Sequence, residues 1–217
     1  MANLYGAEYE KYRVSKCDSR KLMYIQELGR ISKLRNLARG GRILDIGCGQ
    51  GEFLELFNSE WEKWGIEINP ISKKVCLSKH ILINKTLKNN FFDIIIFRGT
   101  IQHIPNPFEW IKKSYHLLKK GGMIIFLATP NTESVYYRLF KELPMLDEKY
   151  NFLLPSEKIL RQTLKNFGYR DIKFYFPYRE TPYARRDDLL KFVLKFFGFR
   201  KLNFAFPRNI LECYALK

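Results

Sequence analysis

Short apolar runs alternate with helical patterns along most of the chain. From residue 18 to 34, apolar side chains recur every three to four positions, which predicts a helix that ends before Gly40 and Gly41. Further helices are predicted at 52–57, 70–79 and 107–120, and strands at 42–46, 63–68, 81–83, 92–97 and 123–127. Several of these strands are apolar on both faces, which is typical of a parallel sheet covered by helices on two sides.

The C-terminal part of the chain has a less regular pattern. Ser156 is placed to cap a helix that ends near Gly168, and two strands are predicted at 171–178 and 209–216. These strands enclose an insert at about residues 180–207. The chain is therefore divided into an N-terminal helical lid, residues 1–40, and an α/β domain, residues 41–217, that carries the insert. Tyr5, Tyr9 and Tyr12 are expected to belong to the lid.

A strongly apolar helix is predicted inside the insert, from about residue 187 to 199. Its polar side chains share a sector roughly 100° wide; they are Asp187, Asp188, Lys191 and Lys195. The remaining face, rich in Leu and Phe, is too wide for a helix that rests on a wet surface. Two alternatives remain for what covers this face. In the first, the helix packs over the sheet edge or against the partner of a homodimer. In the second, it lies on a membrane whose anionic headgroups meet the basic residues that flank it, Arg185, Arg186, Arg200 and Lys201.

Composition adds a strong positive charge and argues against several classes of protein. The chain has 38 Lys and Arg against 22 Asp and Glu, a net charge of +16, which favours anionic partners. The basic residues are spread rather than clustered, so nucleic acid is not the expected partner. Four cysteines without CxxC spacing indicate neither a zinc site nor a disulfide scaffold. With no signal-like N-terminus and no long apolar run, a cytoplasmic location is expected.

A glycine-rich loop follows the first predicted strand, where open α/β sheets bind ligands. Gly47, Gly49 and Gly51 allow a tight turn and a close approach of the backbone to a ligand, and Asp45 precedes them. Glu67, at the end of the second strand, is placed to accept hydrogen bonds from both hydroxyls of a ribose. The G-x-G-x-G spacing differs from the dinucleotide fingerprint G-x-G-x-x-G, and it favours an amino-acid-like group over a pyrophosphate.

Four segments together resemble a known family. Residues 43–53, Ile-Leu-Asp-Ile-Gly-Cys-Gly-Gln-Gly-Glu-Phe, look like the first motif of class I S-adenosylmethionine-dependent methyltransferases. Residues 65–68, 92–107 and 117–131 resemble the ribose-binding, fourth-strand and fifth-strand motifs in the right order. His-Ile-Pro-Asn-Pro at 103–107 and Thr-Pro-Asn at 129–131 are similar to the small-molecule O-methyltransferases of ubiquinone biosynthesis and their relatives.

The resemblance implies a fold, a cofactor and a set of site residues. The fold is a Rossmann-like, seven-stranded, mostly parallel sheet with helices on both faces and the last strand antiparallel. The cofactor is S-adenosylmethionine. Its methionine part is expected to lie on Asp45, Gly47, Cys48, Gly49 and Gly51. Its ribose is expected on Glu67, and its adenine on Ile68 and near Leu87.

Three residues, Arg98, Gly99 and Gln102, depart from the family pattern, and His103 lies next to them. Gly99 and Gln102 stand where quinone-type relatives often carry carboxylates, so no divalent metal is expected. His103 is the candidate general base, with a helix-start histidine bonded to nearby backbone as the alternative. Arg98 is a candidate for binding the carboxylate of the cofactor or of an acidic substrate, with a solvated strand-end arginine as the alternative.

The leading hypothesis is thus a methyltransferase that O-methylates a small molecule, which is acidic or lipid-linked. A nucleic-acid methyltransferase and a non-catalytic binding protein with the same fold remain as alternatives. The chain is expected to be a monomer or a homodimer, with peripheral contact to the inner membrane face if the apolar helix is interfacial.

Overall fold

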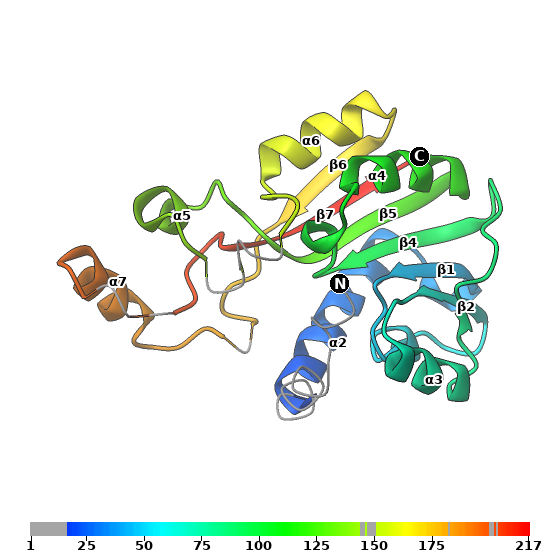
Figure 1. The fold of residues 1–217 in the computed structure, drawn as a ribbon, viewed down its shortest axis with the longest axis horizontal. Coiled ribbons are helices and arrows are strands. Elements are labelled where there is room, and N and C mark those ends of the chain that lie inside the picture. The colour runs from blue at the N-terminus through cyan, green and yellow to red at the C-terminus, as the bar shows by residue number, and fades with distance from the viewer. Residues whose placement is uncertain (1–16, 144–145, 147–150, 182, 200–201, 203) are drawn as a thin grey trace.

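The structure, a computed structural model, describes residues 17–143, 146, 151–181, 183–199, 202 and 204–217. Tyr5, Tyr9 and Tyr12 lie outside the described residues. Seven strands form one sheet in the order β3-β2-β1-β4-β5-β7-β6 (Figure 1). Their bounds are β1 Gly41–Ile46, β2 Trp61–Ile66, β3 Leu82–Ile83, β4 Phe92–Arg98, β5 Leu118–Pro130, β6 Arg170–Tyr175 and β7 Ile210–Leu216.

The strand directions match the predicted fold class. β1 pairs in parallel with β2 and β4, β2 with β3, and β4 with β5. β7 is antiparallel to both of its neighbours, β5 and β6. The Rossmann-like, mostly parallel sheet with an antiparallel last strand is therefore confirmed. The strand order reverses between β1 and β4, so the chain passes to opposite sides of the sheet after these two strands, which opens a site at their carboxyl ends.

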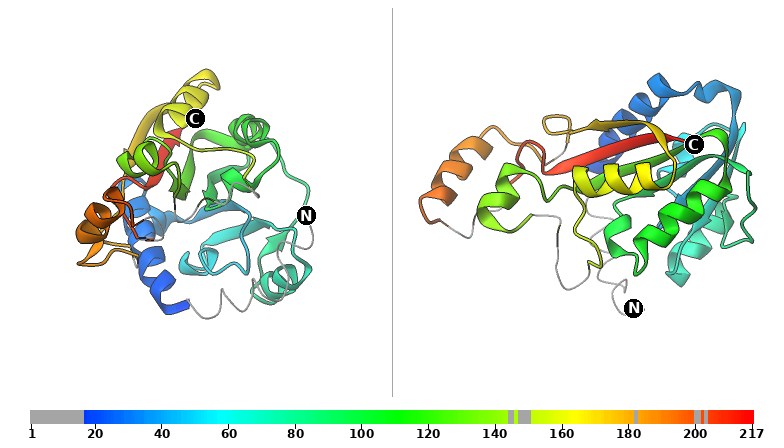
Figure 2. Two further views of the ribbon diagram at one scale, coloured as in Figure 1. Left: turned by 60° about the vertical axis from the view of Figure 1, so that its left-hand side comes forward. Right: turned by 90° about the horizontal axis from the view of Figure 1, so that it is seen from above.

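The described helices are α2 Cys17–Leu34, α3 Pro70–Ser78, α4 Pro107–Leu117, α5 Val135–Phe140, α6 Glu157–Asn166 and α7 Asp188–Phe196. Four of them, α2, α3, α4 and α6, cover the two faces of the sheet (Figures 1 and 2). Side chains of α4 and α6 pack on one face of the strands, and those of α2 and α3 pack on the other. Three short 3-10 turns complete the described elements: η2 Leu37–Arg39, η3 Leu54–Leu56 and η4 Ile101–His103.

Several predicted bounds were wrong. The helix expected at 52–57 is only the turn η3, because the chain must reach β2 by Trp61, whose amide already bonds the Asn58 carbonyl. β5 begins at Leu118, five residues before the predicted strand, because Leu118 pairs with Phe92 of β4. α5 was not predicted.

α2 presents a different face to the core from the one that its leucine and isoleucine spacing predicts. Leu22 and Ile25 are exposed, whereas Tyr24, Glu27 and Ile31 are buried. Tyr24 and Ile31 belong to the same apolar cluster as strand residues such as Ile43. The predicted boundary at residue 40 thus separates α2 from the rest of the domain, although side chains of α2 form part of the domain's core.

A small lobe extends from one end of the sheet, and it contains α5, α7 and the segment before β7 (Figures 1 and 2). Its centre is a separate apolar cluster of Tyr136, Leu143 and Phe204, with Phe140 and Phe192 packed against it. The predicted helix of the insert is confirmed as α7. No described helix is long and apolar enough to cross a membrane.

Candidate active site

The loop after β1 is fixed by its neighbours. The amides of Gly47 and Cys48 donate to the Ile66 carbonyl at the end of β2, at 2.8 and 3.2 Å. Gly47 has φ +80°, and a Cβ there would lie 2.3 Å from Cγ2 of Thr100. The loop therefore fits closely between the ends of β2 and β4, and it can do so because position 47 has no side chain.

A cavity of about 550 Å³ opens where these strands end. The loop, the end of β2, the segment after β4 and α2 all contribute to its wall. The predicted site residues that line it are Asp45, Gly47, Cys48, Gly49, Glu67, Ile68, Arg98 and His103. Sequence reasoning missed other residues in the wall, among them Arg20, Tyr24, Phe53 and Trp110.

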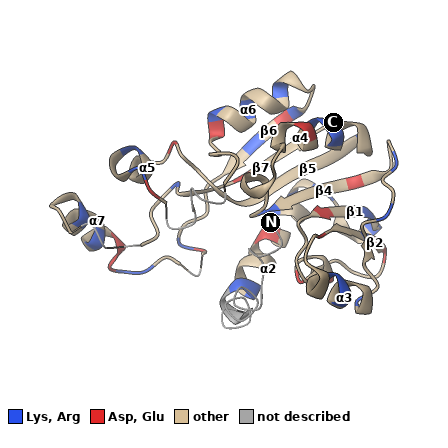
Figure 3. Cartoon of the chain, in the orientation of Figure 1, with Lys and Arg blue, Asp and Glu red and all other residues tan. Residues whose placement is uncertain are grey.

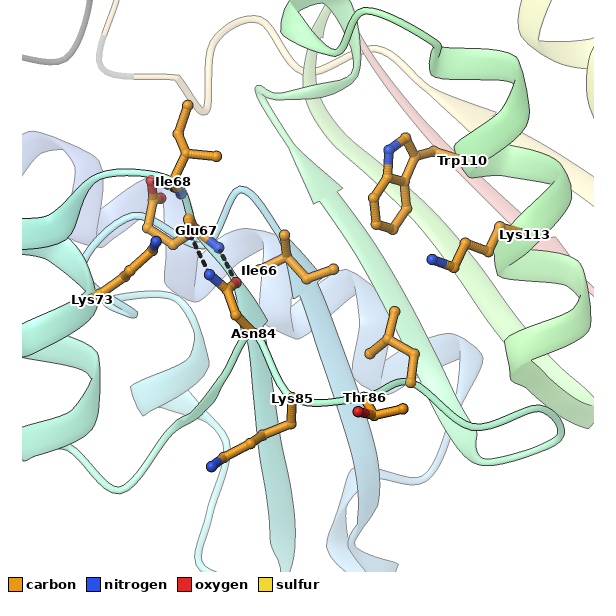
Figure 4. Close-up of a pocket in the computed structure, with 10 residues that line it drawn as sticks. Ile66, Glu67, Ile68, Lys73, Asn84, Lys85, Thr86, Trp110 and Lys113 are labelled. Atoms are coloured by element: carbon orange, nitrogen blue, oxygen red, sulfur yellow. Dashed lines mark hydrogen bonds between the residues drawn. The ribbon is translucent and has the colours of Figure 1, made fainter. Parts of the chain in front are cut away.

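An adjoining open pocket of about 680 Å³ is lined in part by the predicted adenine residue Leu87. Figure 4 shows this pocket. The two hollows share four lining residues and therefore adjoin, and they are together called the cleft; the shared residues are Ile66, Glu67, Ile68 and Trp110. Figure 4 shows Trp110, from α4, on the opposite side of the pocket from Ile68. Ile68 is 56% exposed, which leaves an apolar side chain available to a flat ligand.

The Glu67 carboxylate connects the glycine loop to the segment that follows β2. Its Oε2 accepts from the Gly49 amide at 2.8 Å, and its Oε1 accepts from the amides of Ile68 and Asn69 at 2.7 and 2.8 Å. Asn84 fixes its backbone through two further bonds, drawn in Figure 4. Because a carboxylate has about four acceptor positions, this arrangement leaves room for one ribose hydroxyl rather than both.

Asp45 is buried, and one of its carboxylate oxygens has no hydrogen-bond partner among the described residues. The residue is 2% exposed, and the unpartnered oxygen is Oδ1. Burial raises the pKa of Asp45 to about 7; Arg98 opposes the rise, while the nearby carboxylates of Glu67, Glu27 and Glu52 add to it. A cation placed in the cavity would satisfy this oxygen and favour its ionised form.

Gly51 and Cys48 contribute to the loop in different ways. A Cβ on Gly51 would lie 2.3 Å from Cδ1 of Ile81, and Gly51 is not in the cavity wall. That Gly51 contacts the cofactor stays a prediction; what the structure shows is that its missing side chain lets the loop pack against Ile81, just before β3. Cys48 does line the cavity, and its Sγ lies 3.9 Å from that of Cys76. The pKa of Cys48 is raised by its bond with Cys76 and by burial, which disfavours the thiolate that a nucleophile needs.

Arg98 has a partner that the sequence did not reveal. Its Nε donates to Glu27 Oε2 at 2.7 Å, its Nη2 donates to Oε1 at 3.3 Å, and its guanidinium lies 4.0 Å from the centre of the Tyr24 ring. That Arg98 binds a ligand carboxylate stays a prediction, and the Glu27 carboxylate that already occupies this fork argues against it. The alternative of a solvated arginine is wrong, since the side chain is only 13% exposed.

His103 lies in the turn η4, at the wall of the cavity. Gln102 Nε2 lies 3.2 Å from the Gly99 carbonyl oxygen and 3.3 Å from His103 Nε2. An amide nitrogen only donates, so His103 Nε2 is the acceptor in this pair. Within the described part of the chain, no three His, Cys, Asp or Glu residues are grouped as ligands for a metal ion.

Comparisons with known proteins agree with this arrangement. A family model described as a methyltransferase domain matches residues 18–173. The chain is 28% identical over 178 residues to an uncharacterised protein of Methanocaldococcus jannaschii, a match that covers 78% of this chain and 80% of that one. It is 27% identical over 167 residues to the ubiquinone biosynthesis O-methyltransferase of Glaesserella parasuis, covering 63% and 69% of the two chains.

Solved structures show the same fold. A SAM-dependent methyltransferase from Archaeoglobus fulgidus superposes with a TM-score of 0.65 at 21% identity, over 96% of this chain and 99% of that one. Phosphoethanolamine N-methyltransferase 2 of Haemonchus contortus, solved with S-adenosyl-L-methionine, gives 0.59 at 17% identity, over 88% of this chain and 52% of that one.

The cleft fits the cofactor of this family. The unpartnered oxygen of Asp45 suits the cationic methionine end, one acceptor position of Glu67 suits the ribose, and exposed Ile68 suits the adenine. Gly47 and Gly49 line the cavity at positive φ and place no side chain against a ligand. On the match over most of its length and on this cleft, the chain belongs to the methyltransferase-domain family and is an S-adenosylmethionine-dependent methyltransferase.

Proposed function

We propose that the enzyme methylates a hydroxyl group of a small molecule. The observation that carries this proposal is the position of His103, an imidazole that shares one cavity with Asp45 and the glycine loop. A hydroxyl must lose its proton when it is methylated, and an imidazole can accept a proton near neutral pH. A cytoplasmic location remains a prediction from the sequence.

The cofactor supplies the methyl group on a sulfonium, which is a strong electrophile. The chain then needs to hold the acceptor in line with that methyl and to exclude water, and such alignment contributes much of the rate in reactions of this kind. Asp45 and Glu67 would hold the methionine and ribose ends of the cofactor, and Tyr24, His103 and Ile104 line the same cavity.

Gln102 positions His103 for this role. The contact between Gln102 Nε2 and His103 Nε2 is 3.3 Å long, beyond the usual range for a good N–H···N or N–H···O bond. An acceptor hydroxyl is able to replace this weak donor at Nε2 and then pass its proton to the ring. Gln102 keeps its second bond, to the Gly99 carbonyl, so that the turn stays in place.

The remaining wall indicates the character of the acceptor. Phe53, Ile104, Pro105 and Trp110 supply apolar surface, and Arg20 supplies a positive charge. This combination suits a small, partly apolar acceptor with an acidic group. The similarity to an O-methyltransferase of ubiquinone biosynthesis supports the same class of acceptor.

The test is a measurement of S-adenosylhomocysteine release with three kinds of acceptor. Hydroxylated aromatic acids are expected to be methylated; phosphoethanolamine and bulk transfer RNA represent N-methylation and the nucleic-acid alternative that the +16 charge raises. Turnover with either of these and none with the hydroxylated acids would contradict the proposal. With a working acceptor, His103→Gln should lower kcat roughly 100-fold or more, whereas His116→Gln, at an exposed site on α4, should not.

A further inference from the structure

α7 is an amphipathic helix, and the polar side chains of Asp188 and Lys195 face inward. Asp188 is 1% exposed and Lys195 is 4% exposed. Leu189, Leu190, Val193, Phe196 and Phe197 fall at positions i, i+1, i+4, i+7 and i+8, which share one face of a helix. This face is exposed, with Phe197 at 76%, and no described residue covers it.

Specific contacts hold the helix in this orientation. Lys195 pairs with Glu142, donates to the Leu202 carbonyl at 2.9 Å and lies over the rings of Tyr136 and Phe140. The buried end of Lys195 is thus satisfied on several sides, as a buried ammonium requires.

The start of the helix is anchored in the same way. Asp188 Oδ2 accepts from the Arg185 amide at 2.7 Å and from the Tyr178 hydroxyl at 3.1 Å. Between these two anchors, Phe192 stacks on Phe206 at 4.4 Å between ring centres. These contacts therefore fix the outward orientation of the apolar face, because a rotation of α7 about its axis would break all of them.

The charge around the helix indicates what covers this face. Arg185 and Arg186 are exposed at the start of α7. From residue 179 to 201 the chain carries seven Lys and Arg against three Asp and Glu. In Figure 3 most of α7 is uncharged, and basic residues lie in the loop that leads into it. An apolar helix face with basic flanks is the pattern of helices that lie in an anionic membrane surface.

A second copy of the chain fits this surface less well. Two molecules that each carry +16 would bring their arginines together around a small contact, and such charge opposes self-association. The position of α7 at the outer end of the lobe also leaves it accessible to a flat surface (Figures 1 and 2). We infer that α7 docks the enzyme on anionic lipid, with Phe196 and Phe197 inserted among the acyl chains and Arg185 and Arg186 at the headgroups.

Co-sedimentation of the full chain with vesicles tests this inference. Binding is expected to vesicles of phosphatidylcholine with phosphatidylglycerol, to weaken as salt is raised, and to be much weaker with phosphatidylcholine alone. Phe197→Asp should weaken binding tenfold or more, because it removes a large inserted side chain. Arg185→Gln with Arg186→Gln should weaken it by roughly fivefold for each arginine.

The matched control is Leu77→Asp. Leu77 is also exposed, at 58%, but it lies on α3 in another part of the molecule, and the substitution changes the net charge equally. It should reduce binding by no more than about twofold. Equal losses for Leu77→Asp and Phe197→Asp would overturn the inference, because binding would then depend on net charge alone.

Two other results would also overturn the inference. The first is no binding to anionic vesicles at low salt by a folded chain. The second is a dimer in solution that Phe197→Asp converts to a monomer while vesicle binding is absent, since a second copy would then cover α7. Phe197→Trp offers a further readout: quenching of its fluorescence by brominated lipid, above that of the native tryptophans, is expected only if the side chain enters the bilayer.

Discussion

The guanidinium of Arg98, at the end of β4, forms a two-point ion pair with the carboxylate of Glu27 in the middle of α2. Glu27 is 1% exposed, and burial raises its pKa while Arg98 opposes the rise. Because Arg98 and the neighbouring Tyr24 both line the cavity, this pair fixes α2 against the wall of the active site.

Removing one member of this pair should be costly. Glu27→Ala leaves a buried guanidinium without its partner, and a loss of about 3–5 kcal/mol in the free energy of unfolding is expected from urea denaturation. The control is Glu62→Ala, which breaks the exposed pair with Arg42 and should cost about 1 kcal/mol or less. Adding Arg98→Met to Glu27→Ala should restore part of the loss; simple additivity of the two losses would contradict coupling between the residues.

The architecture could be predicted from the sequence because its signals are local. Apolar strands, the glycine loop and Glu67 are each visible within a few residues, and their order defines the sheet and its carboxyl edge. The partner of Arg98 could not be predicted in this way, since Glu27 is 71 residues away in the chain. The leucine and isoleucine spacing of α2 predicts that one face is buried. Contacts with Arg98 instead turn the face that contains Tyr24 and Glu27 toward the core.

The same limit applies to α7. Periodicity assigns its polar and apolar side chains to two faces, but it cannot say which face points inward. The choice depends on Glu142 and Tyr178, which bond Lys195 and Asp188 from elsewhere in the lobe. Likewise, the early start of β5 depends on Phe92, a strand neighbour that the sequence around Leu118 does not reveal.

Asp45 should make stability depend on pH in the absence of cofactor. With its pKa raised to about 7, the folded chain keeps a proton that the unfolded chain releases near pH 4. The stability that this proton contributes is fully present below about pH 4 and is lost as pH rises through about 7. The free energy of unfolding of the native chain, relative to that of Asp45→Asn, should therefore fall by about 4 kcal/mol over this range.

The affinity for S-adenosylhomocysteine should change with pH in the opposite direction. Its cationic amino group favours ionised Asp45, so calorimetry should show binding that strengthens from pH 6 and levels off above about pH 7.5. Asp45→Asn should bind weakly over the same range, without this rise. A native affinity that does not change between pH 6 and pH 8 would show that Asp45 does not face the cofactor.

Glu67→Ala should weaken binding of S-adenosylhomocysteine by roughly 1–3 kcal/mol, the usual cost of losing a charged acceptor. The variant removes a partner for the ribose and also releases the amides of Gly49, Ile68 and Asn69. Glu67→Gln should recover little, because its amide group replaces one acceptor oxygen by a donor. Glu62→Gln, at an exposed position of β2, serves as the control and should bind normally.

Methyl transfer should require no divalent metal. Gly99 has no side chain to offer, and the Gln102 amide nitrogen is placed to bond the Gly99 carbonyl and His103. Once an acceptor is known, a molar excess of EDTA should leave the rate of S-adenosylhomocysteine release unchanged. Loss of activity with EDTA, and its return with added magnesium, would mean that the substrate or residues outside this turn bind a metal.

Gly47 should be intolerant of even a methyl side chain, for a reason that can be separated from backbone strain. Gly47 and Gly121 both have positive φ, +80° and +73°, but a Cβ on Gly47 would meet Thr100 Cγ2 at 2.3 Å, whereas one on Gly121 meets nothing within 4 Å. Both alanine variants carry the conformational cost of roughly 1–2 kcal/mol. Only Gly47→Ala should also lose affinity for S-adenosylhomocysteine, because the loop must move away from the end of β4.

A second substitution tests that steric cause. Thr100→Ala removes both Cγ2 and Oγ1, the two closest atoms, and leaves Cβ at 3.0 Å from the new methyl group. The double variant Gly47→Ala with Thr100→Ala should therefore bind more tightly than Gly47→Ala alone, measured by calorimetry beside Thr100→Ala as its own reference. Equal affinities of the single and double glycine variants would mean that the left-handed backbone at position 47, and not its contact with Thr100, determines the shape of the cofactor loop.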